Sequence, residues 1–106
     1  MPKFLWKASY TAEGARGVAK DGGTSRRDAV RTATESVGGT LEAFYFAFGD
    51  SDAYVIADLP DNEAAAAVAI AVNGSDRASV QTVTLLSPEQ IDAATKRSVD
   101  FRPAGG

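Results

Sequence analysis

The centre of the chain has the pattern of a β-hairpin. Residues 40–48 and 53–59 are rich in aromatic and β-branched side chains, which pack well on a pleated sheet. Between them lie residues 49–52, Gly-Asp-Ser-Asp, which are of the types that favour tight turns. Two such segments joined by four turn residues predict neighbouring antiparallel strands. This hairpin limits the folds open to the chain, because every other element has to pack around it.

Strand patterns also precede and follow the hairpin, at residues 3–10 and 78–86. Helix patterns lie between and after the strands, and each begins beside a residue that can cap a first turn. The predicted helices are 12–20 after Thr11, 25–37 with Ser25 and Asp28 in capping-box spacing, 62–72 after Asp61, and 88–98 after Ser87. The order β-α-β-β-α-β predicts an α+β fold of the ferredoxin-like type, with an additional C-terminal helix.

The composition removes several classes of chemistry. The 106 residues suit one domain, with a loosely ordered tail expected over residues 100–106. The chain has no cysteine, which excludes disulfides, thiolate catalysis, zinc fingers and iron–sulfur clusters. It also has no histidine, so the usual ligand of haem, copper and zinc is missing. We therefore expect no metal ion and no cofactor.

Charge and hydropathy indicate whether the protein binds nucleic acid or membranes and where it is located. The chain has 11 basic and 14 acidic residues, giving a net charge of −3, so it has no general attraction to nucleic acid or to an anionic membrane. No apolar stretch approaches the roughly 20 residues needed to span a bilayer, and the first residues are too short an apolar run for a signal peptide. The sequence predicts a cytoplasmic protein that binds neither nucleic acid nor membranes.

Both faces of the strand at residues 40–48 are apolar. Helices cover one face of a ferredoxin-like sheet, so the other face would leave aromatic rings in water. We expect a homodimer or a higher homo-oligomer that packs sheet against sheet; the alternative is a C-terminal helix folded over the open face. Strict alternation divides the strand into Leu41, Ala43, Tyr45 and Ala47 on one face, and Phe44, Phe46 and Phe48 on the other.

Several motifs along the chain resemble those of one protein family. They are Ala8-Ser9-Tyr10-Thr11 with Gly14, Gly22-Gly23 with Ser25-Arg26-Arg27, residues 44–56 (FYFAFGDSDAYVI), Asp58-Leu59-Pro60-Asp61-Asn62, and Leu85-Leu86-Ser87-Pro88-Glu89. Together they make the chain similar to the GYD-domain family from Lys3 to about Pro103. The family is named for a Gly-x-Tyr-Asp pattern. Gly49 and Asp52 fit this pattern, whereas Ser51 stands where the tyrosine is expected.

The resemblance implies the fold of the dimeric α/β-barrel superfamily, which agrees with the predicted strand order. Relatives of that fold include cofactor-free monooxygenases, lactone isomerases, haem-dependent chlorite dismutases and ligand-sensing modules. The fold alone does not choose among these activities. The haem branch is disfavoured because the chain offers no histidine to the iron.

Three groups of residues are candidates for a ligand site. Asp50 and Asp52 could bind a hard cation or act as a base, or else only bond the backbone of their own turn. Arg26 and Arg27 follow a glycine-rich loop at a helix start, which suits an anion, or else form ordinary surface ion pairs. The aromatic residues that could line a lumen, or else fill the core and an interface, are Trp6, Tyr10, Tyr45, Phe46, Phe48 and Tyr54.

These residues allow two kinds of function. The first is a homo-oligomeric module that binds a small molecule, or a cofactor-independent enzyme that acts on a small aromatic or apolar metabolite. The second is a non-catalytic module that senses an anion or a metabolite, or that serves in assembly. A closed apolar cavity with one convergent polar group favours the enzyme, and a shallow basic cavity favours binding alone.

Overall fold

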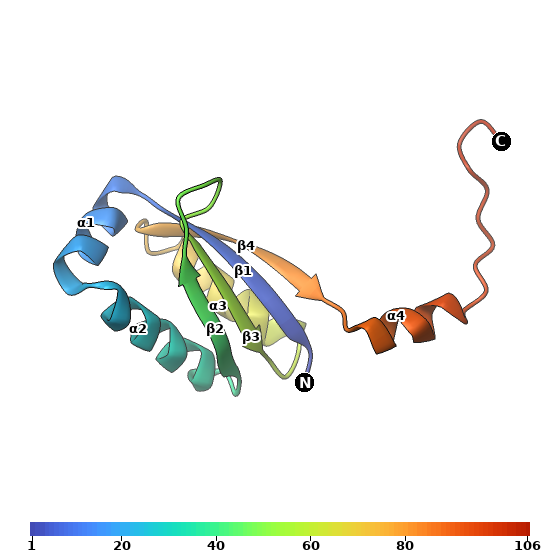
Figure 1. The fold of residues 1–106 in the computed structure, drawn as a ribbon, viewed down its shortest axis with the longest axis horizontal. Helices are drawn as coiled ribbons and strands as arrows, with labels where there is room; N and C mark the ends of the chain where they lie inside the picture. The colour runs from blue at the N-terminus through green and yellow to red at the C-terminus, as the bar shows by residue number, and fades with distance from the viewer.

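The computed structural model describes all of residues 1–106. Its central feature is a four-stranded sheet with helices packed against one face, as Figure 1 shows. The elements in chain order are β1 (Lys3–Tyr10), α1 (Ala12–Asp21), α2 (Gly23–Ser36), β2 (Thr40–Phe46), β3 (Ala53–Asp58), α3 (Asn62–Asn73), β4 (Ala78–Leu85) and α4 (Pro88–Thr95).

The sheet is antiparallel throughout, with the strand order β2-β3-β1-β4. The predicted central hairpin is confirmed, since β2 and β3 pair directly. β1 lies between β3 and β4 and pairs with both. This topology, with α1 and α2 after β1 and α3 after β3, agrees with a ferredoxin-like α+β fold.

The core lies between the sheet and the helices. Phe4 and Trp6 on β1 and Val55 on β3 point to this side and are almost completely buried. They meet the alanine-rich face of α3, while Val30 of α2 and Val37 just after it pack at the edge of the same cluster. The full cluster is Phe4, Trp6, Val55, Ala57, Leu59, Ala64, Ala65 and Val68.

Three of the four predicted helix starts are confirmed by their caps. The Thr11 hydroxyl accepts a hydrogen bond from the Gly14 backbone N–H at 3.1 Å, and the Asp61 carboxylate accepts one from the backbone N–H of Ala64 at 2.8 Å. Ser87 and Gln90 form a complete capping box. Side-chain caps of this kind each stabilise a helix by about 1 kcal/mol.

The prediction that Ser25 caps α2 is wrong. The helix begins two residues earlier, at Gly23, and no side chain caps it. Gly22 has a φ of 87°, a backbone conformation open mainly to glycine, and it redirects the chain from α1 straight into α2. Ser25 therefore already lies within the first turn.

The prediction of strict alternation along β2 is also wrong at one position. A β-bulge at Glu42 shifts the register, so that Leu41 pairs with Ala57 and Ala43 pairs with Ile56. An extra residue in one strand reverses the faces of the residues before it. Leu41 therefore packs against the core together with Phe44, and not on the face of Ala43 and Tyr45.

The face of the sheet opposite the helices, here called the open face, has no other element over it. Apolar and polar side chains alternate on this face. At one end of it Lys3 donates hydrogen bonds to Glu42 and Asp58, and these bonds raise the pKa of Lys3. The alternative that the C-terminal helix folds over this face is wrong in the isolated chain. The outward-pointing apolar side chains of the open face are Leu5, Ala43, Tyr45, Tyr54, Ile56, Val83 and Leu85.

The last helix, α4, lies beyond the end of β4 and away from the sheet (Figure 1). It ends at Thr95 and not near Ser98 as predicted. Every residue from Leu86 to Gly106 is exposed. None of the four helices combines the length and the apolar content needed to cross a bilayer.

Candidate functional site

A cleft of about 610 Å³ lies on the helical side of the sheet. Its walls come from α1, α2 and α3, and the residues around the start of β4 close one end. The wall from α3 is smooth because it presents small side chains, among them Ala67 and Ala71. A cavity of this size, between elements that belong to one core, is typical of sites for small molecules.

An apolar pocket of about 80 Å³ adjoins the cleft on the side of the sheet. The two cavities share lining residues from β1, α2 and α3, including Tyr10, Arg26 and Val68. Aliphatic and aromatic side chains line the pocket, and the guanidinium of Arg26 is the one charged group among them. The cleft therefore has a polar outer part and an apolar inner part.

The indole of Trp6 lines the inner pocket and lacks a hydrogen-bond partner. The side chain is 3% exposed, and its Nε1–H donates to no atom of the chain. A buried donor without an acceptor costs about 1–3 kcal/mol, and such groups are rare in folded proteins. A molecule that placed an acceptor oxygen in the pocket would remove this cost.

Arg26 presents a second donor in the same place. The Nε atom of Arg26 is buried and has no partner, although the residue as a whole is only partly buried. Burial raises the pKa of the neighbouring Tyr10 phenol, and the positive charge of Arg26 opposes that shift. Tyr10 is therefore a neutral phenol at physiological pH, beside a fixed cation.

The charged residues of the outer cleft are mainly basic. Lys20, Arg26 and Arg77 line it together with a single carboxylate, that of Asp21. Arg77 is also held by Glu13 through an ion pair of 3.1 Å. An excess of cations in a partly enclosed cleft attracts an anionic ligand.

A small aromatic cluster supports the inner end of the site. The rings of Tyr10 and Phe46 are stacked with centroids 6.5 Å apart, and Phe44 meets Phe46 edge-on at 5.1 Å. Phe46 also lies against Gly23 at the start of α2, where an added Cβ would come within 3.0 Å of the ring. These contacts fix Tyr10 and the first turn of α2, on which Arg26 stands.

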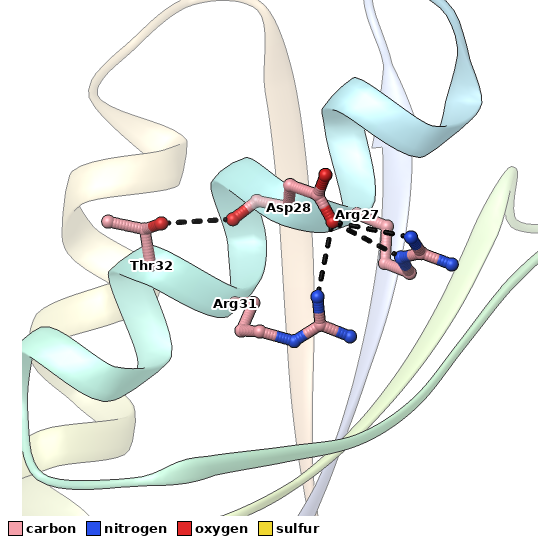
Figure 2. A network of polar contacts seen from close by, with 4 residues as sticks. All are labelled: Arg27, Asp28, Arg31 and Thr32. Atoms are coloured by element: carbon pink, nitrogen blue, oxygen red, sulfur yellow. Dashed lines mark hydrogen bonds and ion pairs between the residues drawn. The ribbon is translucent and has the colours of Figure 1, made fainter.

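The structure separates the two predicted arginines. Arg27 is exposed and contacts the carboxylate of Asp28 at 3.4 Å, and Arg31 contacts the same carboxylate at 3.1 Å (Figure 2). Thr32 bonds the Asp28 carbonyl from the next turn. Arg27 lines neither cavity and belongs to an ion-pair cluster on the surface of α2.

The two predicted aspartates lie in the loop between β2 and β3. The Asp52 carboxylate accepts a hydrogen bond from the backbone N–H of Tyr10 at 2.8 Å, and its own N–H donates to the carbonyl of Ala8. Asp52 thus ties the loop to β1, next to the cleft, while Asp50 is exposed and bonds nothing. The two carboxylates therefore have no hydrogen-bond partner in common.

The six predicted aromatic residues fall into three places. Trp6, Tyr10 and Phe46 lie on the helical side of the sheet, Tyr45 and Tyr54 form a cross-strand pair on the open face, and Phe48 is fully exposed in the loop. The candidate site therefore consists of Trp6, Tyr10 and Arg26, with Phe46 packed behind Tyr10.

Sequence reasoning missed part of the cleft. Lys20 and Arg77 are far apart in the sequence, and no motif relates them; the cleft brings them together. No motif marks the alanine-rich run of α3 either, yet Ala67 and Ala71 form a wall of the cleft. The row of alanines in the sequence could have indicated the cleft, because small side chains on a helix leave room beside the helix.

Comparison with known proteins gives one match. A family model described as the GYD domain matches residues 4–95, which include all four helices and all the strands except Lys3, the first residue of β1. No curated protein and no solved structure shows significant similarity to the chain.

Proposed function

The chain belongs to the GYD domain family, and we propose that it is a homo-oligomeric module that binds a small organic anion with an aromatic or apolar body. The ligand occupies the cleft between the sheet and the helices. The observation that carries this proposal is the unpartnered indole N–H of Trp6, buried at the apolar end of a cleft whose open end is basic.

Two buried donors favour a ligand with an acceptor group. The Nε1–H of Trp6 and the Nε–H of Arg26 both lack partners, and both residues line the inner pocket. A ligand that accepts hydrogen bonds from these donors is stabilised, because the two N–H groups have already lost their water in the free protein and binding adds no further desolvation cost for them. A ligand with carboxylate or phenolate oxygens in the pocket would supply acceptors for these donors.

The distribution of charge favours an anion over a neutral molecule. Lys20, Arg26 and Arg77 exceed by one charge the two carboxylates beside them, Asp21 in the cleft and Glu13, which pairs with Arg77, although the chain as a whole is acidic. The apolar lining of the inner pocket favours a hydrocarbon or an aromatic body in the same ligand. An amphipathic anion satisfies both parts of the cleft.

The second part of the proposal is a homodimer formed through the open face, with the geometry of a dimeric α/β barrel. The open face carries Leu5, Tyr54, Ile56 and Val83 at alternating positions on three strands. The first three are partly exposed and Val83 is exposed, and no helix lies over them. Each apolar side chain removed from water contributes roughly 1.5–3 kcal/mol. A second copy offers the same pattern under two-fold symmetry.

A second candidate function is a cofactor-independent enzyme that acts on the same ligand. Tyr10 favours it, because the phenol lines both cavities beside Arg26 and keeps its proton at neutral pH, so it has a proton to give to a bound molecule. The test is to identify any molecule that the purified protein retains, by native mass spectrometry, and to incubate it with wild-type protein and with Tyr10→Phe. Conversion by wild type alone supports catalysis, and conversion by neither contradicts it.

The binding proposal is tested by calorimetry with trans-cinnamate as the probe anion and trans-cinnamamide as its neutral counterpart. Arg26→Gln removes a charged donor from the cleft and should weaken cinnamate binding at least tenfold, since a hydrogen bond to a charged group contributes about 1.5–3 kcal/mol. Arg27→Gln removes the same charge from the same helix but outside the cleft, so it should bind like wild type.

Two outcomes would overturn the binding proposal. One is equal affinity for the anion and the amide, which would mean that the basic residues do not select charge. The other is equal loss in Arg26→Gln and Arg27→Gln, which would mean that only the overall charge of α2 matters.

A further inference from the structure

The chain ends in an arm that touches nothing else. Residues 86–106, here called the arm, comprise α4 and the segments on both sides of it, and all of them are exposed. Figure 1 shows the arm beyond the end of β4, with no other element beside it. The radius of gyration is 16.7 Å, against about 13 Å for a compact chain of this length.

The arm has the composition of a segment that packs on a surface. Ile91 is 46% exposed, Val99 77% and Phe101 76%, and Leu86 is exposed as well. The helix within it has eight residues, and isolated helices shorter than about 12–15 residues are marginal in water. Its capping box contributes only about 1 kcal/mol. The arm therefore needs an apolar surface to hold its structure.

The matching surface is the open face at its β2–β3 margin. Tyr45 and Tyr54 lie opposite each other there, and Tyr45 is 72% exposed. The arm of the same chain leaves from β4, which is the strand at the other edge of the sheet. Tyr45, on the edge strand β2, is thus separated from the start of the arm by the full width of the sheet.

We propose that the arm crosses to a second copy of this chain and packs Ile91 and its neighbours against Tyr45 and Tyr54 of that copy. This inference rests on the homodimer proposed above. When two open faces meet under two-fold symmetry, each sheet covers the centre of the other, and each arm continues past the edge of its own sheet. In this exchange each arm covers Tyr45 and Tyr54 of the other copy, and each arm is itself packed against that copy.

Charge is complementary across the proposed contact. Lys7 lies on the open face and forms no ion pair within the chain. Glu89 and Asp92 on α4 also form none. The helix α4 thus brings two acidic groups to a face with an unpaired cation, which favours association of the two copies. The side chains of the arm as a whole carry no net charge, because Lys96, Arg97 and Arg102 balance its three carboxylates.

Photo-crosslinking distinguishes exchange from other placements of the arm. Ile91 is replaced by p-benzoylphenylalanine in unlabelled protein, which is mixed with 15N-labelled wild-type protein, left to exchange subunits and irradiated. Cross-links from the unlabelled arm to labelled peptides of β2 or β3 support the proposal. Cross-links confined to unlabelled chains contradict it, and so do cross-links to labelled peptides of α1, α2 or α3.

A full-length variant pair gives the second test, by sedimentation velocity over a range of concentrations. Ile91→Glu should raise the dimer dissociation constant about a hundredfold, because the symmetric dimer contains the contact twice. Ala93→Glu adds the same charge about 200° around α4 and should leave the constant unchanged. A dimer in which Ile91→Glu has no effect would contradict the arm exchange and leave the homodimer intact; a monomeric wild type would contradict both.

Discussion

Arg26 and Arg27 follow one another in the sequence and serve different environments. Successive residues of an α-helix point about 100° apart, so two adjacent side chains can face different surroundings. Arg26 enters the cleft with an unpartnered Nε, and Arg27 joins the Asp28 ion pair at the surface. The sequence predicts both at a helix start, but it does not show which one faces the cleft, because that depends on how α2 packs against the sheet.

Trp6 shows the same limit for a buried residue. Alternation along β1 placed Trp6 on the same face as Phe4, and both are buried together. The absence of an acceptor for its indole N–H depends on where the atoms of α2 and α3 lie, which no local pattern specifies. The feature that carries the proposed function could therefore not be predicted from the sequence.

The Tyr10 phenol links the site to the pH dependence of stability. Its pKa in the folded chain is raised above 10.0 by burial, so over a range of alkaline pH the folded state keeps a proton that the unfolded chain has lost. This contribution to stability is complete below about pH 10 and disappears as the pH rises through the folded-state pKa.

We therefore expect wild-type protein to lose more stability than Tyr10→Phe between pH 9 and pH 11. Urea unfolding at the two pH values measures this difference. Groups common to both proteins, Lys3 among them, cancel in the comparison. An equal loss in the two proteins would show that Tyr10 does not titrate abnormally.

At the scale of elements, local signals predicted most of the fold. Thr11, Asp61 and Ser87 cap the helices predicted for them, and the turn at residues 49–52 joins the predicted hairpin. The misses arise where one element meets another. The bulge at Glu42 fits β2 to β3, and Gly22 fits α1 to α2, so both depend on partners that lie outside the local pattern.

Close approach of α1 to the segment before β4 gives a prediction at this scale. A Cβ added at Gly14 would lie 1.8 Å from the carbonyl oxygen of Arg77, and backbone cannot move aside cheaply. Gly14→Ala should reduce the free energy of unfolding by about 3 kcal/mol, as overpacking does in a close-packed core.

Gly17→Ala is the matched control on the same helix. No atom lies within 4 Å of its added Cβ, so the better helix propensity of alanine should raise the free energy of unfolding by about 0.5–1 kcal/mol. Urea denaturation of the two variants measures both changes. Similar stabilities for Gly14→Ala and Gly17→Ala would contradict the contact between α1 and Arg77.

At the scale of the whole molecule, the order of elements predicted the topology, and the sheet order β2-β3-β1-β4 follows from it. The strand patterns also indicated that one face would remain uncovered. The sequence did not predict that α4 stands clear of the sheet, because a capped helix with an apolar side fits either placement. Both the open face and the arm point to a second copy.

The proposed homodimer predicts a difference between two exposed apolar residues. Val83 lies on the open face and Ile70 on α3, outside the open face. Val83→Lys should weaken the dimer at least tenfold, because it places charges in an apolar interface, and Ile70→Lys should leave it unchanged. Light scattering across a concentration series measures the effect. Monomers at every concentration in wild type, or equal effects in both variants, would argue against this face.

The proposed ligand cleft is tested most directly by the indole N–H of Trp6. The chain has one tryptophan, so a 15N-labelled sample gives a single indole signal in a proton–nitrogen correlation spectrum. Addition of trans-cinnamate should shift this signal downfield as the N–H gains an acceptor, and the shift should be strongly reduced in Arg26→Gln. An indole signal that stays in place while the signals of open-face residues move would contradict the account.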